Sequence, residues 1–293
     1  MLFKRLIGSL AALSLAGCAT VETAPRGAVP GPALWRVSDK DTTIYLFGTV
    51  HALPKDKPWF DGRIERAFNS SNELVTEIDI GNAAQSTAAL QAASLLPDGQ
   101  SLRSMMTPEN RQQYEAAMVG LGLPVEALDR NEPWFAALTL SLLPLLRGGY
   151  DTQSGVELSL GSRAGDKQRG ALETIDQQIA LFDQMPQDAQ LAFLDETVEA
   201  LPDETHSLDA MVAEWLEGDA DQLAVLMNAE LTDPTLRDRL LTSRNANWAG
   251  WIENRLQQPG TVFIAVGAGH LAGAGSVQDQ LQQRGVKVRR VWQ

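Results

Sequence analysis

Two segments of the chain, YLFGTVHALP (residues 45–54) and FIAVGAGHLA (residues 263–272), repeat one local pattern. In each segment an apolar run reaches a glycine, and a histidine follows three residues later, at His51 and at His270. The chain of 293 residues has three histidines, so two of the three stand in the same setting far apart in sequence. We therefore expect the two runs to be neighbouring strands that bring both histidines to one place.

The two runs are apolar at consecutive positions, which is typical of strands buried on both faces. Ligands of open α/β sheets bind beyond the carboxyl ends of the strands, where His51 and His270 fall. A third strand-like run, ELVTEID (residues 73–79), has Glu77 and Asp79 near its carboxyl end. Two imidazoles and a carboxylate at neighbouring strand ends are typical of a hydrolytic metal site. Spacing alone also allows a simpler interpretation, in which each histidine only forms hydrogen bonds within its loop.

The order of strand-like and helix-like runs predicts an α+β (mixed α/β) fold. Strands lie near both ends of the chain, so we expect a central mixed sheet built from N- and C-terminal strands, with a large helical insertion between them. The predicted strands cover residues 34–50 (a hairpin), 73–80, 170–175, 260–270 and 286–292. The predicted helical regions cover residues 59–72, 84–150, 154–168, 176–258 and 275–285. Helix starts are expected near Thr107, Pro186, Ser207 and Asp233.

The N-terminal residues MLFKRLIGSLAALSLAGC have a basic start, an apolar run and a small-residue ending, which is the layout of a secretory signal peptide. The run is too short to span a bilayer as a stable helix. Its ending resembles a bacterial lipobox, in which the cysteine, here Cys18, becomes lipidated; the alternative is an ordinary signal peptide with a chance cysteine. We expect residues 1–17 to be a lipoprotein signal peptide, residues 18–33 a flexible tether, and residues 34–293 a single domain.

The charge of the mature chain limits its partners. Without Lys4 and Arg5, the chain from Cys18 keeps 22 of its 24 basic side chains against 37 acidic ones, a formal net charge of −15 in place of −13. Such a charge argues against nucleic acid or anionic lipid as a partner. The expected membrane link is therefore the lipid alone, on the periplasmic face of the envelope, and Ala19 favours the outer membrane by resemblance to enterobacterial lipoproteins. Because Cys18 is the only cysteine, no disulfide forms within the chain and no other thiol is available as a nucleophile.

Several familiar catalytic patterns are absent from the sequence. The chain contains neither HExxH, the helical zinc-protease pattern, nor the GxSxG nucleophile elbow. Residues 267–272, GAGHLA, do fit the dinucleotide fingerprint GxGxxG/A after a strand. However, the next strand carries Lys287, Arg289 and Arg290 where a ribose-binding acid should follow, so a nucleotide cofactor is not expected.

Five pieces of the chain together resemble one family. They are YLFGTVHALP, LVTEID, GYDTQSGVELSLGSRAGDKQRGALETIDQQIALF, RNANW and FIAVGAGHLAGAGSVQDQLQQRGVKV. One GxxH segment is a weak signal, but two in this order, with the LET…QQ piece and the Arg-Asn pair between them, are specific. From about residue 33 to residue 291, the chain resembles the TraB/GumN family, which also contains the Tiki metalloproteases.

The resemblance implies a set of site residues. The Tiki branch is similar to metal-dependent peptidases that use manganese or cobalt, and zinc is also conceivable. By position, His51 and His270 would be metal ligands with Glu77 as their acidic partner. Glu173, Arg244 and Asn245 would line the same cavity, although Glu173 has the alternative role of capping the helix near Asp176. Arg244 and Asn245 have the alternative of pairing with acidic neighbours and a helix end.

Two further positions bear on this assignment. Gly269 directly precedes His270, where we expect a small non-glycine residue more often in the family. His206, the third histidine, stands in PDETHSLDA without a strand or glycine beside it, and we expect it to be a surface or capping residue.

The expected function is a cell-envelope lipoprotein with a metal-dependent hydrolase domain that acts on peptides or another small substrate. In this mechanism a divalent ion activates water, Glu173 or Asp79 accepts the proton, and Arg244 stabilises the negative charge on the substrate oxygen. One alternative is a non-catalytic envelope protein that binds a peptide, signal or glycan in the same cleft. Another is an ester hydrolase, because the erythromycin-esterase type of fold is similar in its use of histidine and glutamate.

Overall fold

The computed structural model describes residues 31–292 except residues 56, 80, 82, 203, 231 and 232. The predicted signal peptide, the lipidation residue Cys18 and all but the last three residues of the predicted tether lie outside the described residues. Their assignments stay predictions, as does the single-domain boundary at residue 34.

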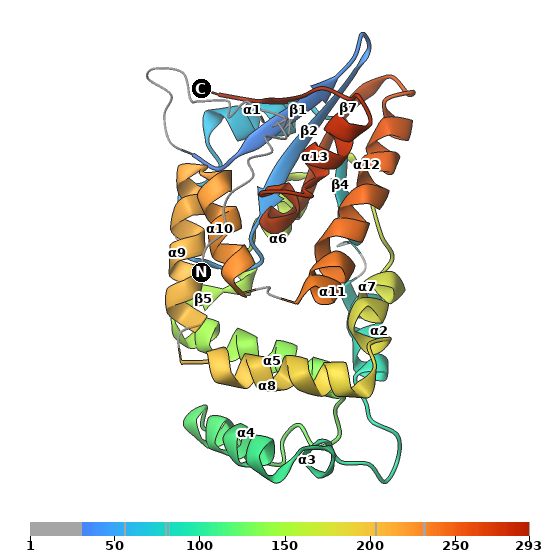
Figure 1. The fold of residues 1–293 in the computed structure, drawn as a ribbon. Coiled ribbons are helices and arrows are strands. Elements are labelled where there is room, and N and C mark those ends of the chain that lie inside the picture. Colours follow the sequence, from blue (N-terminus) through green and yellow to red (C-terminus); the bar gives the residue numbers. More distant parts are fainter. Residues whose placement is uncertain are drawn as a thin grey trace, which may run out of the picture.

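Six strands form one mixed sheet in the order β6-β4-β7-β2-β1-β8 (Figure 1). They are β1 (Leu34–Ser38), β2 (Thr42–Thr49), β4 (Glu73–Thr76), β6 (Gln168–Ala171), β7 (Gly260–Gly267) and β8 (Val288–Arg290). Strand β7 is parallel to both β2 and β4, and β4 is parallel to β6. Strand β1 is antiparallel to its two neighbours, β2 and β8. The predicted fold class, with N- and C-terminal strands side by side in a mixed sheet, is confirmed.

Helices cover both faces of this sheet because its central strands are apolar on both sides. Along β7, Phe263 and Ala265 belong to one core, and Val262, Ile264 and Val266 belong to the other. The first core is closed by α1 (Gly62–Ser70), α6 (Val156–Arg163), α9 (Glu204–Glu217) and α10 (Ala220–Glu230). The second core is closed by α12 (Ser243–Arg255) and α13 (Val277–Gln283).

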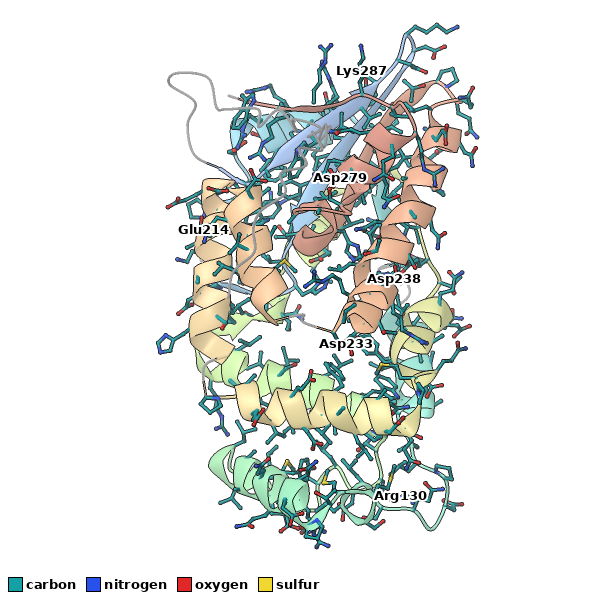
Figure 2. All side chains as sticks on the ribbon, in the orientation of Figure 1. Arg130, Glu214, Asp233, Asp238, Asp279 and Lys287 are labelled. Atoms are coloured by element: carbon teal, nitrogen blue, oxygen red, sulfur yellow. The ribbon has the colours of Figure 1, made fainter. Side chains whose placement is uncertain are left out.

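The predicted helical insertion forms a layer beyond the sheet, with buried residues of its own. Its helices are α2 (Ala83–Ala93), α3 (Leu102–Met105), α4 (Pro108–Gly120), α5 (Pro133–Arg147), α7 (Ile175–Asp183), α8 (Gln187–Ala200) and α11 (Pro234–Arg237). Tyr114, Leu140 and Leu194 are buried together where α4, α5 and α8 meet. In Figure 2, Arg130 marks the far end of this layer and Lys287 lies at the opposite end of the molecule. The starts expected at Thr107 and Asp233 are confirmed, because both side chains cap helices that begin with proline.

The remaining elements are short. They are the two-stranded sheet of β3 (Leu53–Pro54) and β5 (Tyr150–Asp151), the 3₁₀ turns η2 (Thr152–Ser154) and η4 (Ala268–Leu271), and the π-helical turn η3 (Asp238–Thr242). The sequence did not predict these elements. Among the described residues, no helix is both long enough and apolar enough to cross a membrane.

Several predicted boundaries are wrong by a few residues. The strand expected at residues 170–175 is Gln168–Ala171, and its first two residues are exposed at the edge of the sheet, which explains their polar character. The strand expected to reach residue 80 ends at Thr76, and the helix expected to reach residue 168 ends at Arg163. The helix start expected at Ser207 lies three residues earlier, at Glu204.

Candidate functional site

Four parallel strands end at one edge of the sheet. Thr49 of β2 pairs with Gly267 of β7, and Thr76 of β4 pairs with Ala265 of β7 and Ala171 of β6. The segments that follow these ends carry His51, Glu77, Glu173 and His270. The prediction that strands ending near Val50, Ile78 and Val266 lie side by side is therefore confirmed, and the two histidine segments leave the same edge.

His270 lies in η4 and is buried, with 5% of its side chain exposed. Its Nδ1 is 2.5 Å from Oδ1 of Asn245, whose Nδ2 donates to the carbonyl of Gly275 at 2.9 Å. Because that second bond assigns Oδ1 as the acceptor, Nδ1 of His270 carries the proton and Nε2 has the free lone pair. That lone pair accepts a hydrogen bond from Arg244 Nη1 at 2.9 Å, and the ring packs on Trp248 at 4.2 Å between centroids.

Arg244 connects two acidic side chains of this edge, Glu77 and Glu173. Its Nε and Nη2 donate to the two oxygens of Glu173 at 2.8 and 2.9 Å, in the bidentate geometry typical of arginine and carboxylate. Nη2 also donates to Glu77 Oε2 at 2.6 Å, and Nη1 donates to the carbonyl of Leu240 at 3.0 Å. We call Glu77, Glu173, Arg244, Asn245 and His270 the buried cluster. Its two carboxylates outnumber its one cation, so the cluster keeps a net negative charge.

The two carboxylates of the buried cluster have further donors. Glu77 Oε1 accepts from the N–H of Gly267 at 2.7 Å, and its Oε2 accepts from Gln178 Nε2 at 2.8 Å. Glu173 Oε1 accepts from Trp248 Nε1 at 3.0 Å. The alternative that Glu173 caps the following helix is wrong, because the side chain of Thr174 fills that role. The alternative that Arg244 pairs with acidic neighbours describes its contacts correctly.

The environment of the buried cluster fixes its charges. Burial lowers the pKa of His270 to about 3, with Arg244 adding to the effect and Glu77 opposing it, so the ring is neutral near pH 7. Burial raises the pKa of Glu77, but the neighbouring His270 and Arg244 side chains and the Gly267 N–H outweigh it, and the net shift is downward. Glu77 is therefore a carboxylate, and His270 is positioned to accept rather than donate at Nε2.

His51 has a different environment at the same edge. Its side chain is 78% exposed, and Nδ1 donates to Glu157 Oε1 at 2.8 Å. Thr49 Oγ1 donates to the same oxygen at 2.5 Å. The hydrogen bond to Glu157, and then its charge, raise the pKa of His51 to about 9, so this histidine is protonated near pH 7. We call His51 and Glu157 the exposed pair.

The close approach of Gly155 and a backbone hydrogen bond of Val156 hold the exposed pair in place. A β-carbon on Gly155 would lie 2.3 Å from the carbonyl oxygen of His51, so only glycine fits beside that backbone. The next residue, Val156, donates its N–H to the carbonyl of Val50 at 3.0 Å. Helix α6, which carries Glu157, is thereby fastened to the histidine segment.

The side chains at this edge match a divalent transition ion in type but not in arrangement. Imidazoles and carboxylates are suitable donors. In the part of the chain that the structure describes, however, no three histidine, cysteine, aspartate or glutamate side chains come together around one point. Nε2 of His270 accepts from Arg244, and Nδ1 of His51 donates to Glu157. The assignment of His51, Glu77 and His270 as ligands of one ion stays a prediction.

The structure places the other predicted residues outside these groups. Asp79 is exposed and accepts the N–H of Gly81 at 2.8 Å, so it does not reach the buried cluster. His206 is exposed on α9, as expected for a surface residue. Sequence reasoning missed Glu157, Gln178 and Trp248. The signal for Glu157 was a carboxylate between the apolar residues of VELSL, a position that also suits a solvated helix face.

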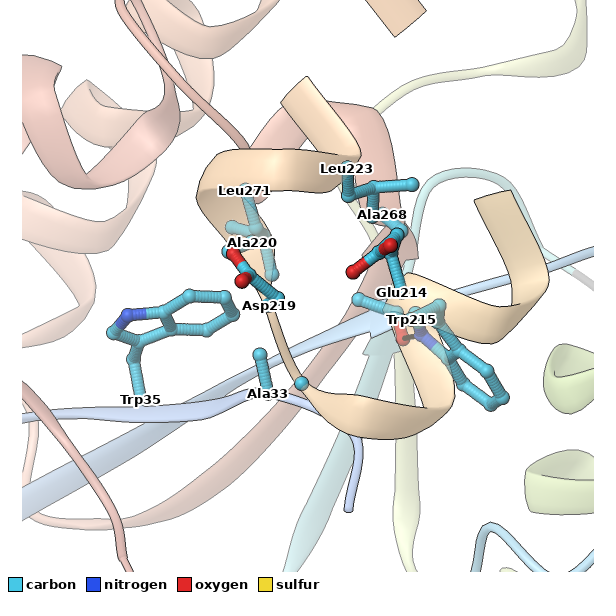
Figure 3. Close-up of a pocket in the computed structure, with 11 residues that line it drawn as sticks. Ala33, Trp35, Glu214, Trp215, Asp219, Ala220, Leu223, Ala268 and Leu271 are labelled. Atoms are coloured by element: carbon cyan, nitrogen blue, oxygen red, sulfur yellow. Dashed lines mark hydrogen bonds between the residues drawn. The ribbon is translucent and has the colours of Figure 1, made fainter. Parts of the chain in front are cut away.

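Figure 3 shows a small cavity at the turn between α9 and α10, lined by Trp35, Trp215 and Leu271 among others. Its volume of about 10 Å³ suits at most one water molecule, so it is not a substrate site. It instead marks where the insertion packs on the first histidine strand, because Trp215 Nε1 donates to the carbonyl of Gly48 at 2.8 Å.

Known proteins are similar in sequence to this chain over most of its length. Relatives include "Uncharacterized protein YbaP" of Escherichia coli, 26% identical over 82% of this chain and 88% of the relative. An uncharacterized protein of Treponema pallidum is 23% identical over 88% of this chain and 84% of that protein. "Metalloprotease TIKI2" of Danio rerio is 25% identical over 83% of this chain, but the match covers 57% of that longer protein. No solved structure matches the chain significantly.

The family profile described as "TraB/PrgY/gumN family" matches residues 33–290, which include both histidine segments and the whole insertion. The chain belongs to the TraB/PrgY/gumN family.

Proposed function

We propose that this protein is a hydrolase of the bacterial cell envelope that cleaves peptide bonds at the edge where the exposed pair and the buried cluster meet. The observation that carries the proposal is the exposed pair: a protonated, 78% exposed imidazole held by a carboxylate, at the same sheet edge as a net negative cluster. The name "Metalloprotease" of two zebrafish relatives supports peptide-bond hydrolysis.

Each residue of the proposed centre has a distinct task. His51 holds its Nδ1 proton against Glu157 and offers its Nε2 proton to the leaving amine as a general acid. Glu77 Oε1 lies 3.9 Å from His270 Nε2, and the segments that carry Glu77 and His51 leave the same edge of the sheet. We therefore assign to Glu77 the proton of the attacking water. Of the bases predicted from sequence, Asp79 lies apart and Glu173 is held by two parallel bonds from Arg244, whereas Glu77 has one bond from Arg244, whose exchange would free a lone pair on Oε2.

Arg244 is the residue proposed to stabilise the negative charge on the substrate oxygen. All its nitrogens bond protein acceptors in the structure, so it must exchange one of these partners for the substrate. The contact with Glu77 is the one to exchange, because Glu173 is held by two parallel bonds.

The proposal has a more specific part, which is that the hydrolase uses a divalent metal ion. The relatives' names and the donor types support it, whereas the contact of Arg244 with His270 Nε2 opposes it. An ion that binds this nitrogen must displace the guanidinium. Metal analysis of the purified full-length protein tests the point. A stoichiometric transition ion supports metal use, and full activity of metal-free protein in chelator contradicts it.

A peptide-library digest tests hydrolysis. We expect cleavage by the wild type, with manganese or cobalt more effective than magnesium if an ion takes part. The His51→Ala/His270→Ala double variant should be inactive, and His206→Ala should match the wild type. Cleavage that persists in the double variant would assign the activity to a contaminant or another site.

A non-catalytic binding protein is the second candidate. The observation in its favour is that every nitrogen of Arg244 and both oxygens of Glu77 and Glu173 already bond protein groups, as in a purely structural network. Tight binding of a peptide, signal or glycan without turnover would favour this function over hydrolysis.

The envelope location rests on the N-terminal residues alone. We propose that Cys18 carries the lipid and anchors the protein on the periplasmic face, with the outer membrane favoured. Membrane fractionation of a Cys18→Ala variant tests this. Release of the variant supports the anchor, and a variant that stays with the membranes at unchanged size contradicts it.

A further inference from the structure

A pocket of about 500 Å³ is lined by chain neighbours of the exposed pair: Leu53 lies two residues after His51, and Leu158 directly follows Glu157. Its walls come from β3, which begins two residues after His51, and from η2 and α6. These walls are attached to the histidine segment, because Gly155 lies against the carbonyl of His51 and Val156 bonds the carbonyl of Val50. The pocket is thus built on the same backbone that positions His51.

Helix α6 serves both the exposed pair and the pocket. Glu157 bonds His51, whereas the next two residues, Leu158 and Ser159, and Ser162 one turn later line the pocket. Successive side chains of a helix are rotated by about 100°. Leu158, Ser162 and Ser159 therefore lie about 100°, 140° and 200° around α6 from Glu157, so the pocket and the exposed pair lie on different sides of this helix. The pocket stays close to His51 through β3, because Leu53 is two residues from His51 and two residues of extended chain span about 7 Å. That separation is within reach of one extended peptide.

The chemistry of the pocket differs from that of the chain as a whole. The chain carries 37 acidic side chains, yet no aspartate or glutamate is among the described residues that line this pocket. Its polar groups are the ammonium of Lys57, the amide of Gln153 and the hydroxyls of Ser154, Ser159 and Ser162. Each of these groups has a donor, one carries a positive charge, and the hydroxyl of Ser162 already donates to the carbonyl of Ser159 at 2.8 Å.

Residues around the pocket add to this excess of cationic and hydrogen-bond-donating groups. Arg163 adds a second cation, since its Nε lies 3.3 Å from Oγ of Ser159. A neighbouring pocket of about 270 Å³ shares Pro54 and Lys57 but is lined by Asp209 and Glu217. Of these two pockets, the one beside α6 combines a cation with donors and has no carboxylate among its described lining residues.

The floor of the pocket is apolar. Leu53 and Trp59 line it and are 1% and 6% exposed, so they are fixed in the core and present only a small surface. Trp59 is held by stacking on Phe47, with ring centroids 5.8 Å apart. A lining that combines fixed apolar side chains with a cation and hydrogen-bond donors suits a side chain that has methylene groups and an anionic end.

We propose that this pocket is a substrate subsite for an acidic side chain, glutamate or aspartate, of a peptide whose scissile bond lies at the exposed pair. The identification of the ligand as a substrate rests on the proposed function. The methylene groups contact Leu53 and Trp59, and the carboxylate bonds Lys57, the amide of Gln153 and the hydroxyls of Ser154 and Ser159.

The test is a binding measurement that does not depend on cleavage. Acetyl- and amide-capped pentapeptides Ala-Ala-Glu-Ala-Ala and Ala-Ala-Gln-Ala-Ala are titrated into full-length His51→Ala protein by calorimetry. We expect the glutamate peptide to bind about fivefold more tightly than its glutamine counterpart, in the range of a single partly exposed charge pair. Equal affinities, or binding of neither peptide at millimolar concentration, would overturn the proposal.

Matched variants, each made in the His51→Ala protein, test whether the preference for glutamate arises at this pocket. Lys57→Glu should abolish the preference for glutamate, whereas Lys55→Glu should keep it, because Lys55 lines neither pocket and pairs with Asp151 at 3.6 Å. Ser162→Leu fills the proposed subsite and should weaken binding, and Ala213→Leu fills the neighbouring pocket and should not. The proposal would be overturned if Lys57→Glu and Lys55→Glu lost the glutamate preference equally, or if Ser162→Leu and Ala213→Leu weakened binding equally.

Cleavage by the wild type is scored separately with the same two peptides. A glutamate preference in binding without cleavage would keep the pocket as an acidic-peptide site and remove the hydrolase function. Cleavage of both peptides at equal rates, with equal binding, would keep the hydrolase and remove the subsite.

Discussion

The two histidine segments have the same sequence pattern and opposite environments. His270 is buried among Asn245, Arg244 and Trp248 and has a pKa of about 3, whereas His51 is 78% exposed, bonds Glu157 and has a pKa of about 9. The neighbours explain the difference: α12 and η4 enclose His270, while His51 leaves the sheet edge toward solvent. The same sequence pattern therefore places a neutral imidazole in the buried cluster and a protonated imidazole in the exposed pair.

Removal of Arg244 should destabilise the buried cluster more than any other change proposed below. Arg244→Ala leaves Glu77 and Glu173 buried without their cation, and we expect a loss of about 3–5 kcal/mol in the free energy of unfolding, together with loss of activity. Urea denaturation measures the first effect. Arg244→Lys keeps the charge but loses the bidentate contact, so it should recover part of the stability. A loss below about 1 kcal/mol in Arg244→Ala would show that the buried cluster is not formed as described.

Alanine substitutions of the two histidines should separate stability from activity. His270→Ala removes a buried ring with two hydrogen bonds and should cost about 2–4 kcal/mol. His51→Ala should cost about 1 kcal/mol or less, since the ring is exposed and Thr49 still bonds Glu157. Both variants should lack activity. Thermal unfolding and peptide cleavage check this with His206→Ala as the control, and equal destabilisation by the two substitutions would contradict the difference in burial.

Two glycine substitutions sharpen the comparison at the backbone. A β-carbon at Gly155 would meet the backbone carbonyl of His51, and Gly155→Ala should cost about 1–3 kcal/mol and reduce activity by displacing His51. A β-carbon at Gly269, beside His270, would meet only the flexible end of Met227, and Gly269→Ala should cost less than about 1 kcal/mol. Unfolding curves and cleavage rates measure both. The reverse order of effects would mean that Met227, and not the His51 backbone, is the rigid neighbour.

The pH dependence of stability should show the two histidines acting in opposite directions. His51 gains protons on folding, so its contribution is present below about pH 6.5 and is lost as the pH rises through about 9. His270 stays neutral when folded, so stability is lost as the pH falls below about 6.5 toward 3, where only the unfolded chain takes up the proton. Unfolding free energies measured from pH 4 to 10 should flatten on the alkaline side in His51→Ala and on the acid side in His270→Ala. The same change in both variants would contradict the assigned charges.

Much of the arrangement followed from sequence, because strand ends are a local property. The apolar runs before His51 and His270 predicted parallel neighbours, and the register of Thr49 with Gly267 confirms them. The resemblance placed Glu173, Arg244 and Asn245 in one cavity with the histidines, but the opposite exposure of His51 and His270 was not predictable, because it depends on how α6 and α12 pack at the sheet edge. Glu157 was missed for a related reason: a charged residue in a helix is exposed by default, and only the approach of α6 to β2 turns it toward His51.

The central place of β7 in the sheet has a consequence for how the chain folds. Thr42 pairs with Gly260, so the strand that joins β2 to β4 is made after the whole insertion has been synthesised. Until then β2 and β4 have unpaired apolar edges, which are prone to associate with other chains. Contacts of such large sequence separation form slowly. The nascent protein therefore exposes these apolar edges until that last central strand is in place.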